Sequence, residues 1–240
     1  MTSDLLFRPP LLLGGLTGDA AKAFPIRLRL FSARSDKREI YRLRYRAFVA
    51  AGWIEGGAKG LFADRYDELP TSFSIAAFND GNCVGALRFA FGGRGSPSGS
   101  MPCEEEFPDL VQALTALDNK RLVEFGRMAI EPTLTNNSFR ATLFGSLARS
   151  ACIVATAAEA DIALIAVHAR LSRFYQSMCG FEVLGTSNAY AEIREPTHFL
   201  GREFRALDDR RRERNTFFDV TGEEVESMRA GLAAERGAAA

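Results

Sequence analysis

Residues 160–185 read ADIALIAVHARLSRFYQSMCGFEVLG, and this stretch predicts a strand, a helix and a second strand in succession. The apolar run Asp161–Val167 has the length and the β-branched content of a buried strand. A helix over Leu171–Met178 follows and stops at Gly180, a residue type that tolerates the left-handed conformation at a helix end. Phe181–Gly185 then returns as the next strand. The stretch therefore indicates a sheet covered by helices.

Similar signals continue on either side of this stretch. Residues 121–130, RLVEFGRMAI, predict a strand, and Ser138 is a natural N-cap for a helix that ends near Ala158. Farther upstream, the sequence NDGN at 79–82 joins two apolar runs, which is a strong hairpin signal. The other expected elements are strands at Ile26–Phe31, Ser72–Phe78, Cys83–Phe91 and Tyr190–Arg194, helices from Asp36 to about Ala51 and over Asp109–Leu117, a long loop at 52–70 and a flexible excursion at 92–102. This order predicts an α+β fold with a mixed central sheet.

The chain is expected to form one main domain over residues 1–204, followed by a charged C-terminal helix with a frayed end over 205–240. The apolar start LLFRPPLLLGG, residues 5–15, is too short to span a membrane, so we expect it to pack on the domain. A chain of 240 residues buries enough apolar surface to fold without disulfides or a metal.

Composition argues against several classes of function. Lys and Arg total 30, as do Asp and Glu, so the chain has no net positive charge to attract nucleic acid. The four cysteines form no C-x-x-C pair and are accompanied by only two histidines, which argues against a metal site. Reduced thiols and the lack of a secretory signal favour a cytoplasmic location. Nineteen phenylalanines indicate either a Phe-rich core or a tunnel for an aliphatic ligand.

Two arginines stand where apolar side chains are expected. Arg44 shares a helix stripe with apolar residues, and Arg88 lies within the apolar strand CVGALRFAF. A buried arginine needs anionic partners, and Asp64 and Asp67 in ADRYDELP are the candidates. Such a network serves either a substrate site or the structure alone.

Glu124 and Arg127 lie three residues apart in the predicted strand 121–130. In a regular strand they would face opposite sides of the sheet, whereas a β-bulge at Gly126 would bring them together. The alternative interpretation is that both charges lie at the edge of a sheet.

Taken in order, these residues resemble a known motif series. The series comprises Arg44-x-x-x-Phe48, Trp53, Asp64-x-x-Asp67, Arg88 and Glu124-x-x-Arg127. It is similar to the series of the acyl-homoserine-lactone (autoinducer) synthases and of their relatives, the N-acyl amino acid synthases. The resemblance implies a GNAT-like acyltransferase fold, with a V-shaped split in the sheet and an acyl chain donated by acyl carrier protein.

Residues 160–185 also resemble the C-terminal half of GNAT enzymes, where a helix bearing Phe-Tyr precedes Gly-Phe. This places Tyr175 where many of these enzymes have the tyrosine that protonates the leaving thiolate; the alternative is a tyrosine that only packs its helix. The element favours the N-acyl amino acid synthases over the autoinducer synthases. The sequence departs from acetyl-CoA-dependent members at 132–145, PTLTNNSFRATLFG, which lacks the glycines that hold the pyrophosphate. Ser138 and Arg140 at this helix N-terminus would still receive one phosphate, as in phosphopantetheine.

The resemblance implies a reaction in a split between the strands 121–130 and 161–167. Glu124 would take a proton from the acceptor amine, directly or through water, and Tyr175 would protonate the leaving thiol. A backbone N–H beside the bulge would stabilise the oxyanion, and pantetheine would bind the strand edge at Met128 and Ile130. The resemblance also implies that Arg88, Asp64 and Asp67 hold the acceptor or order the loop around it. Arg44 and Arg127 would fix carboxylate geometry. Phe48 and Trp53 would line the acceptor or acyl pocket.

The predicted function is N-acyl transfer of a long acyl chain from acyl carrier protein to the amine of an amino acid or a related small amine, with acyl-CoA as the other candidate donor and no bound cofactor. The alternatives are an autoinducer synthase that uses S-adenosylmethionine, or a non-catalytic module that binds acyl chains or carrier protein. Arg140, Arg149, Arg170 and Arg173 offer a basic face for an acidic carrier protein. A lipid product would favour peripheral contact with a membrane.

Overall fold

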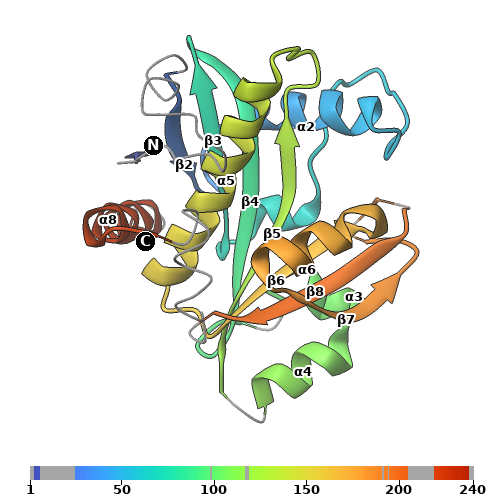
Figure 1. The fold of residues 1–240 in the computed structure, drawn as a ribbon. Helices are drawn as coiled ribbons and strands as arrows, with labels where there is room; N and C mark the ends of the chain where they lie inside the picture. The colour runs from blue at the N-terminus through green and yellow to red at the C-terminus, as the bar shows by residue number, and fades with distance from the viewer. Residues whose placement is uncertain are drawn as a thin grey trace.

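A mixed β-sheet forms the centre of the computed structural model (Figure 1). The structure describes residues 3–5, 25–97, 99–116, 119–190, 192–193, 195–204 and 219–237. Within them the strand order is β1-β2-β3-β4-β5-β6-β8-β7. The strands are β1 (Ser3–Asp4), β2 (Arg27–Phe31), β3 (Ser72–Asn79), β4 (Asn82–Gly93), β5 (Arg121–Ile130), β6 (Ile162–His168), β7 (Glu182–Ser187) and β8 (Thr197–Glu203). All neighbours pair antiparallel except β5 and β6, so the expected mixed α+β sheet is confirmed.

Helices cover both faces of this sheet. In Figure 1 the long α5 (Asn137–Ala157) and the short α6 (Ser172–Cys179) cross the near face, with α2 (Arg38–Ala50) behind it. The other helical elements are η1 (Arg65–Glu68), α3 (Cys103–Glu106), α4 (Pro108–Ala116), η2 (Ala169–Leu171) and α8 (Gly222–Gly237). The hairpin between β3 and β4 forms as expected, with Asp80 and Gly81 both at positive φ.

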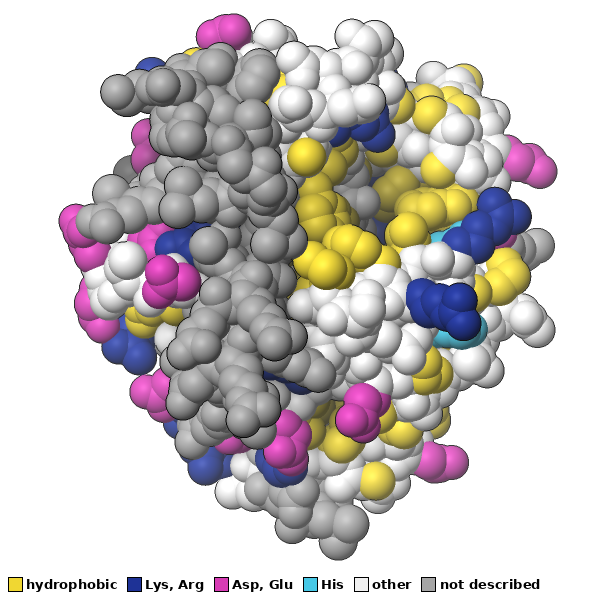
Figure 2. Space-filling model, in the orientation of Figure 1, with side chains coloured by type: hydrophobic (Ala, Val, Ile, Leu, Met, Phe, Trp, Pro, Cys, Tyr) yellow, Lys and Arg dark blue, Asp and Glu magenta, His cyan; other side chains and the backbone are white. Residues whose placement is uncertain are grey.

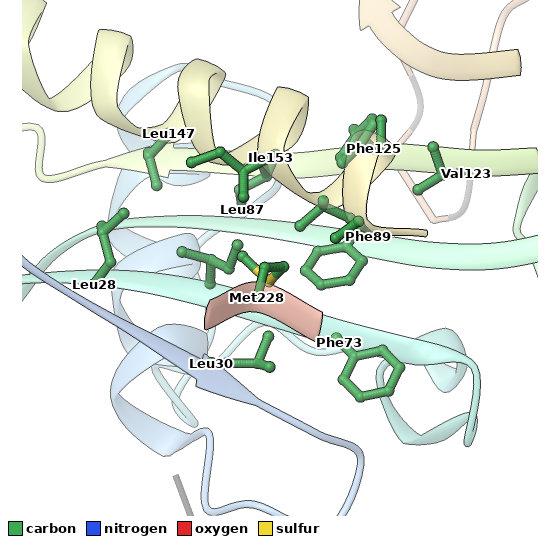
Figure 3. Close-up of a cluster of buried hydrophobic side chains, with 14 of the residues drawn as sticks. Leu28, Leu30, Phe73, Leu87, Phe89, Val123, Phe125, Leu147, Ile153 and Met228 are labelled. Carbon is green, nitrogen blue, oxygen red and sulfur yellow. The ribbon is translucent and has the colours of Figure 1, made fainter. Parts of the chain in front are cut away.

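The main hydrophobic core lies between the sheet and α5 (Figure 3). Figure 3 shows Leu147 and Ile153 of α5 above Leu87 and Phe89 of the sheet. The C-terminal helix α8 adds three buried side chains to the same cluster, Val225, Met228 and Leu232. Its Glu224 also forms a buried ion pair of 2.7 Å with Arg149 of α5. The expected C-terminal helix is therefore packed into the core of the domain.

The predicted split in the sheet lies between β5 and β6. The two strands pair in parallel only from Leu122–Phe125 with Ile162–Ile165. Beyond that point β5 stays with β4 as far as Ile130, while β6 stays with β8 as far as His168. Because each strand follows a different neighbour, the two diverge and leave a gap in the sheet.

The predicted β-bulge is present in β5, one residue beyond Gly126. Arg88 pairs with Gly126 and Ala86 pairs with Ala129, so Arg127 and Met128 together face the single residue between them on β4. Arg127 has a φ of 54°, the left-handed conformation that the first residue of a G1-type bulge adopts. The extra residue breaks the alternation of the strand and puts Arg127 on the face that carries Glu124.

Several sequence-based boundaries were wrong. Asn136, not Ser138, caps α5, since its side-chain oxygen accepts the backbone N–H of Phe139 at 3.0 Å. The described residues of the final strand predicted at Tyr190–Arg194 form only an isolated bridge, in which Tyr190 and Ile193 exchange backbone hydrogen bonds. The strand that completes the sheet is β8, inserted between β6 and β7. Of the segment 5–15 only Leu5 is described, and residues 205–218 also lie outside the described part.

Candidate active site

A cavity of about 180 Å³ opens where β5 and β6 diverge. Figure 2 shows a hollow in this region with hydrophobic side chains gathered around it. One part of the wall is apolar and belongs to the α5 and α6 side of the sheet, with Ala148, Ala151, Cys152, Tyr175 and Phe181 among its residues. Because other wall residues come from the opposite face, the cavity passes through the split.

The wall on the α2 side is aromatic and polar. Phe48 and Trp53, predicted to line the acceptor or acyl pocket, both contribute to it, and their rings lie 5.4 Å apart. Trp53 stacks on His168 at 5.9 Å, and His168 Nε2 lies 3.6 Å from a carboxylate oxygen of Glu195. The backbone N–H of Arg170 donates to His168 Nδ1 at 3.1 Å, which orients the ring. This end of the cavity therefore offers both aromatic surface and charge.

The predicted ion-pair network is present and buried behind this end. Arg44 binds both oxygens of Asp67, at 2.7 and 2.8 Å. Arg88 donates to one oxygen of Asp64, and Arg127 donates to the other through Nε at 2.9 Å and Nη2 at 2.7 Å. All five side chains are less than 10% exposed. The network thereby ties α2, η1, β4 and β5 together.

Short backbone contacts complete the network. The N–H of Asp64 donates to Asp67 at 3.0 Å and the N–H of Tyr66 donates to Asp64 at 3.0 Å, so the two carboxylates also fold the turn η1. Lys37 donates to the backbone oxygen of Asp67, and burial lowers the pKa of this amine to about 8. Burial opposes the ionisation of Asp67, but Arg44 and Arg88 outweigh it and bring its pKa down to about 2. Only Arg127 among the five network residues lines the cavity.

Glu124 lies near the network but outside the cavity wall. One carboxylate oxygen accepts the hydroxyl of Tyr190 at 2.6 Å, and the other accepts the backbone N–H of Cys103 at 3.0 Å. The residue is 3% exposed, and burial raises its pKa above the usual value for a glutamate. Tyr190 does line the cavity. Glu124 is thus separated from the cavity by one tyrosine side chain.

Tyr175 occupies the opposite, apolar side of the cavity. Burial, with Cys179 beside it, raises the pKa of its phenol to about 12, so the hydroxyl keeps its proton at neutral pH. Its ring packs edge-on against Phe174 and Phe181. Tyr175 therefore both packs against its neighbours and lines the cavity, two positions that the sequence analysis treated as alternatives.

The predicted donor-binding residues are dispersed. Met128 lines the cavity, whereas Ile130 pairs with Gly85 at the far end of β5. Ser138 is in the first turn of α5. Arg140 donates to the backbone oxygens of Glu131 and Leu134 at 3.5 and 3.4 Å, and so holds the loop before the helix. Arg149, expected on a basic docking face, is buried against Glu224 and is unavailable for that role.

Sequence reasoning missed Tyr190, His168, Glu195 and Cys103 as site residues. Tyr190 and Glu195 lie in the connection between β7 and β8, and Cys103 lies in the insertion between β4 and β5, segments whose positions depend on distant contacts. His168 is the last residue of β6. Only the aromatic character of Tyr190 in an otherwise polar stretch could have drawn notice.

A family comparison identifies this chain. The family model described as N-acyl amino acid synthase FeeM matches residues 39–203, which is more than half of the chain. The chain belongs to this family. It is accordingly an N-acyltransferase enzyme of GNAT-like fold. No curated protein sequence matches the chain.

Solved structures share the fold of this FeeM-family chain. FeeM, an N-acyl amino acid synthase from uncultured soil microbes, superposes with a TM-score of 0.62 at 17% identity and covers 82% of this chain and 98% of its own. The acyl-homoserine-lactone synthase LasI gives 0.55 at 16% identity, over 74% of this chain and 90% of its own. BjaI, a CoA-dependent acyl-homoserine-lactone synthase, has a TM-score of 0.51 at 15% identity, and the superposition covers 87% of this chain and 88% of BjaI. At these identities the superpositions speak for the fold alone. Within the described ranges, no helix is both long and apolar enough to cross a membrane.

Proposed function

We propose that this enzyme transfers a long acyl chain from acyl carrier protein to the α-amine of an amino acid. The observation that carries the proposal is the cavity through the split, which joins an apolar wall at α5 and α6 to Arg127 at the opposite end. The acyl chain would occupy the apolar part, and the thioester carbonyl would then lie near the bulge in β5. Membership of the N-acyl amino acid synthase family supports the same reading.

The charge balance around Arg127 favours an anionic acceptor. Three arginines, Arg44, Arg88 and Arg127, pair with only two carboxylates, Asp64 and Asp67, so the ion-pair network carries one more positive than negative charge. Burial and the neighbouring Arg88 lower the pKa of Arg127, so an added negative charge would relieve this guanidinium. The carboxylate of an amino acid supplies that charge. The sulfonium of S-adenosylmethionine would instead need a carboxylate: Asp64 and Asp67 are already paired with arginines, and Glu195 on the cavity wall lies 3.6 Å from His168.

The start of α5 bears on the donor. A helix N-terminus attracts phosphate through its unpaired N–H groups. Here Asn136 already caps one of them and Arg140 is held by loop carbonyls, and no glycine-rich turn is present at 132–136 to cradle a second phosphate. This arrangement supports a single phosphate, as in the phosphopantetheine of a carrier protein, over the longer anion of CoA.

The reaction follows from these positions. The amine attacks the thioester carbonyl, and a backbone N–H at the Arg127–Met128 bulge stabilises the oxyanion. Glu124, whose pKa burial raises above the usual value for a glutamate, receives the proton lost by the amine. Tyr175 gives its proton to the departing thiolate, and the same apolar surroundings that raise the phenol pKa also raise the thiol pKa.

The test is thiol release from palmitoyl-carrier protein, measured against a panel of amino acids, S-adenosylmethionine and no acceptor, with palmitoyl-CoA and acetyl-CoA as alternative donors. We expect transfer from the carrier to an amino acid, and Glu124→Gln should lower turnover about 10²-fold with donor affinity unchanged. Activity confined to acetyl-CoA would overturn the proposal. Activity confined to S-adenosylmethionine would establish the autoinducer reaction instead.

A further inference from the structure

The base predicted for this reaction does not reach the cavity by itself. Glu124 is not part of the cavity wall, and its two oxygens are held by the hydroxyl of Tyr190 and the N–H of Cys103. Tyr190 is part of the wall, on the same side as Arg127. A proton that leaves an amine in the cavity therefore meets the phenol before it meets the carboxylate.

We propose that Tyr190 is a catalytic residue that relays the proton of the acceptor amine to Glu124; the inference rests on the proposed function. As the C–N bond forms, the amine nitrogen loses a proton to Tyr190 Oη, and the proton already on that oxygen passes to Glu124 Oε1. The C–S bond breaks and the thiolate takes a proton from Tyr175. Glu124 then returns its proton through Tyr190 to the emptied cavity and Tyr175 is reprotonated, so the net reaction consumes amine and thioester and forms amide and thiol.

The turn that carries Tyr190 is built to hold the phenol in this position. Tyr190 and Ile193 exchange backbone hydrogen bonds of 2.8 and 3.1 Å. The ring stacks on Phe107 at 6.2 Å and on Phe199 at 6.4 Å, with interplanar angles of 27° and 22°. Phe107 also closes over Gly185, where an added Cβ would lie 2.9 Å from its ring. The phenol therefore has little freedom to turn away from Glu124.

The carboxylate is oriented for the same transfer. The N–H of Cys103, at the start of α3, occupies one oxygen of Glu124, so the other is directed to Tyr190. At 2.6 Å the Tyr190–Glu124 contact has the length of a charge-assisted O–H···O⁻ bond. Burial and the adjacent Glu124 raise the pKa of Tyr190 well above the usual value for a phenol, so the hydroxyl holds its proton until the amine supplies another. The insertion between β4 and β5, which carries Cys103 and Phe107, thus completes the relay.

The experiment compares Tyr190→Phe with a matched deletion of a hydroxyl elsewhere. Tyr45→Phe removes a phenol that bonds the backbone of Gly57 outside the cavity. With palmitoyl-carrier protein and the preferred amino acid, we expect Tyr190→Phe to lower kcat about 10²-fold with KM unchanged, and Tyr45→Phe to keep both. The double variant Glu124→Gln with Tyr190→Phe should be no slower than the slower single variant, since both break one relay.

The outcomes separate the relay from the function. If wild type turns over and Glu124→Gln does not, while Tyr190→Phe stays within threefold of wild type, the relay is wrong and the proposed function stands. If wild type transfers acyl groups to no amine, both fall. Should Tyr190→Phe fail to fold, 3-fluorotyrosine and 3,5-difluorotyrosine at position 190 keep the hydroxyl and lower its pKa in steps. A kcat that stays constant across this series would equally overturn the relay.

Discussion

Replacing Asp64 with Asn removes the negative charge that two buried arginines share. The carboxylate accepts hydrogen bonds from Arg88, from two nitrogens of Arg127 and from the backbone of Tyr66. An amide of the same shape keeps one acceptor oxygen, and its NH₂ group faces a guanidinium instead of binding it. Two arginines then stay buried with one anion fewer. Removing one partner of a buried ion pair destabilises a protein because it leaves an uncompensated buried charge.

The size of the effect follows from that count. Removing one partner of a buried ion pair costs about 3–5 kcal/mol, a large share of the roughly 5–15 kcal/mol that stabilises a domain. With an m value of about 3 kcal/mol/M in urea, the unfolding midpoint should fall by roughly 1–2 M. Arg88→Met should cost less than Asp64→Asn, because Asp64 keeps Arg127 and Asp67 keeps Arg44.

Urea unfolding followed by tryptophan fluorescence and by circular dichroism measures this shift. Asp36→Asn is the matched control, since Asp36 pairs with Arg38 at the exposed start of α2 and its removal should leave the midpoint within error. The double variant of Asp64→Asn and Arg88→Met should lose less stability than the sum of the two single variants. A midpoint for Asp64→Asn within 0.3 M of wild type, at about 3 kcal/mol/M, would show that these charges are not buried as described.

Three further outcomes are expected. The pKa of Asp67 is lowered from 3.8 to about 2, so its ionised carboxylate adds about 2 kcal/mol to the free energy of unfolding. This contribution is present above pH 4 and is lost as the pH falls through about 2. Acid unfolding of Asp67→Asn should not show that loss. Tyr175→Phe should lower kcat, and less so for thioesters whose leaving thiol has a low pKa; an equal loss with every leaving group would remove Tyr175 as the acid. Ala151→Phe places a ring in the apolar part of the cavity and should shift the preference toward shorter acyl chains. The control Ala113→Phe, on the exposed face of α4, should leave the preference unchanged. An unchanged chain-length preference in Ala151→Phe would place the acyl chain elsewhere.

Local sequence was sufficient for most elements of the fold. The hairpin at β3–β4 needs positive φ at 80 and 81, and Asp-Gly supplies it within the turn itself. The strand β5 was predicted at its observed bounds, because its apolar residues and flanking breaks are local signals. Arg44, Arg88, Asp64 and Asp67 could be linked in advance, since a cation in an apolar stretch has to find an anion. The spacing of Glu124 and Arg127 left two alternatives, a bulge near Gly126 or a position at a sheet edge, and the structure shows the bulge.

The tertiary structure decided what depends on partners distant in the chain. Thr197–Glu203 has weak strand character, yet it becomes a central strand because β6 and β7 offer backbone groups on both sides. Asn136 rather than Ser138 caps α5, and the run Asn136, Asn137 and Ser138 offers three polar candidates that local sequence does not distinguish. Tyr190 and Glu124 lie 66 residues apart, and they meet because the stacked rings of Phe107 and Phe199 hold the turn against the sheet. The sequence shows which side chains can carry charge or a proton. Which of them contact one another is decided by the packing of segments that are distant in the chain.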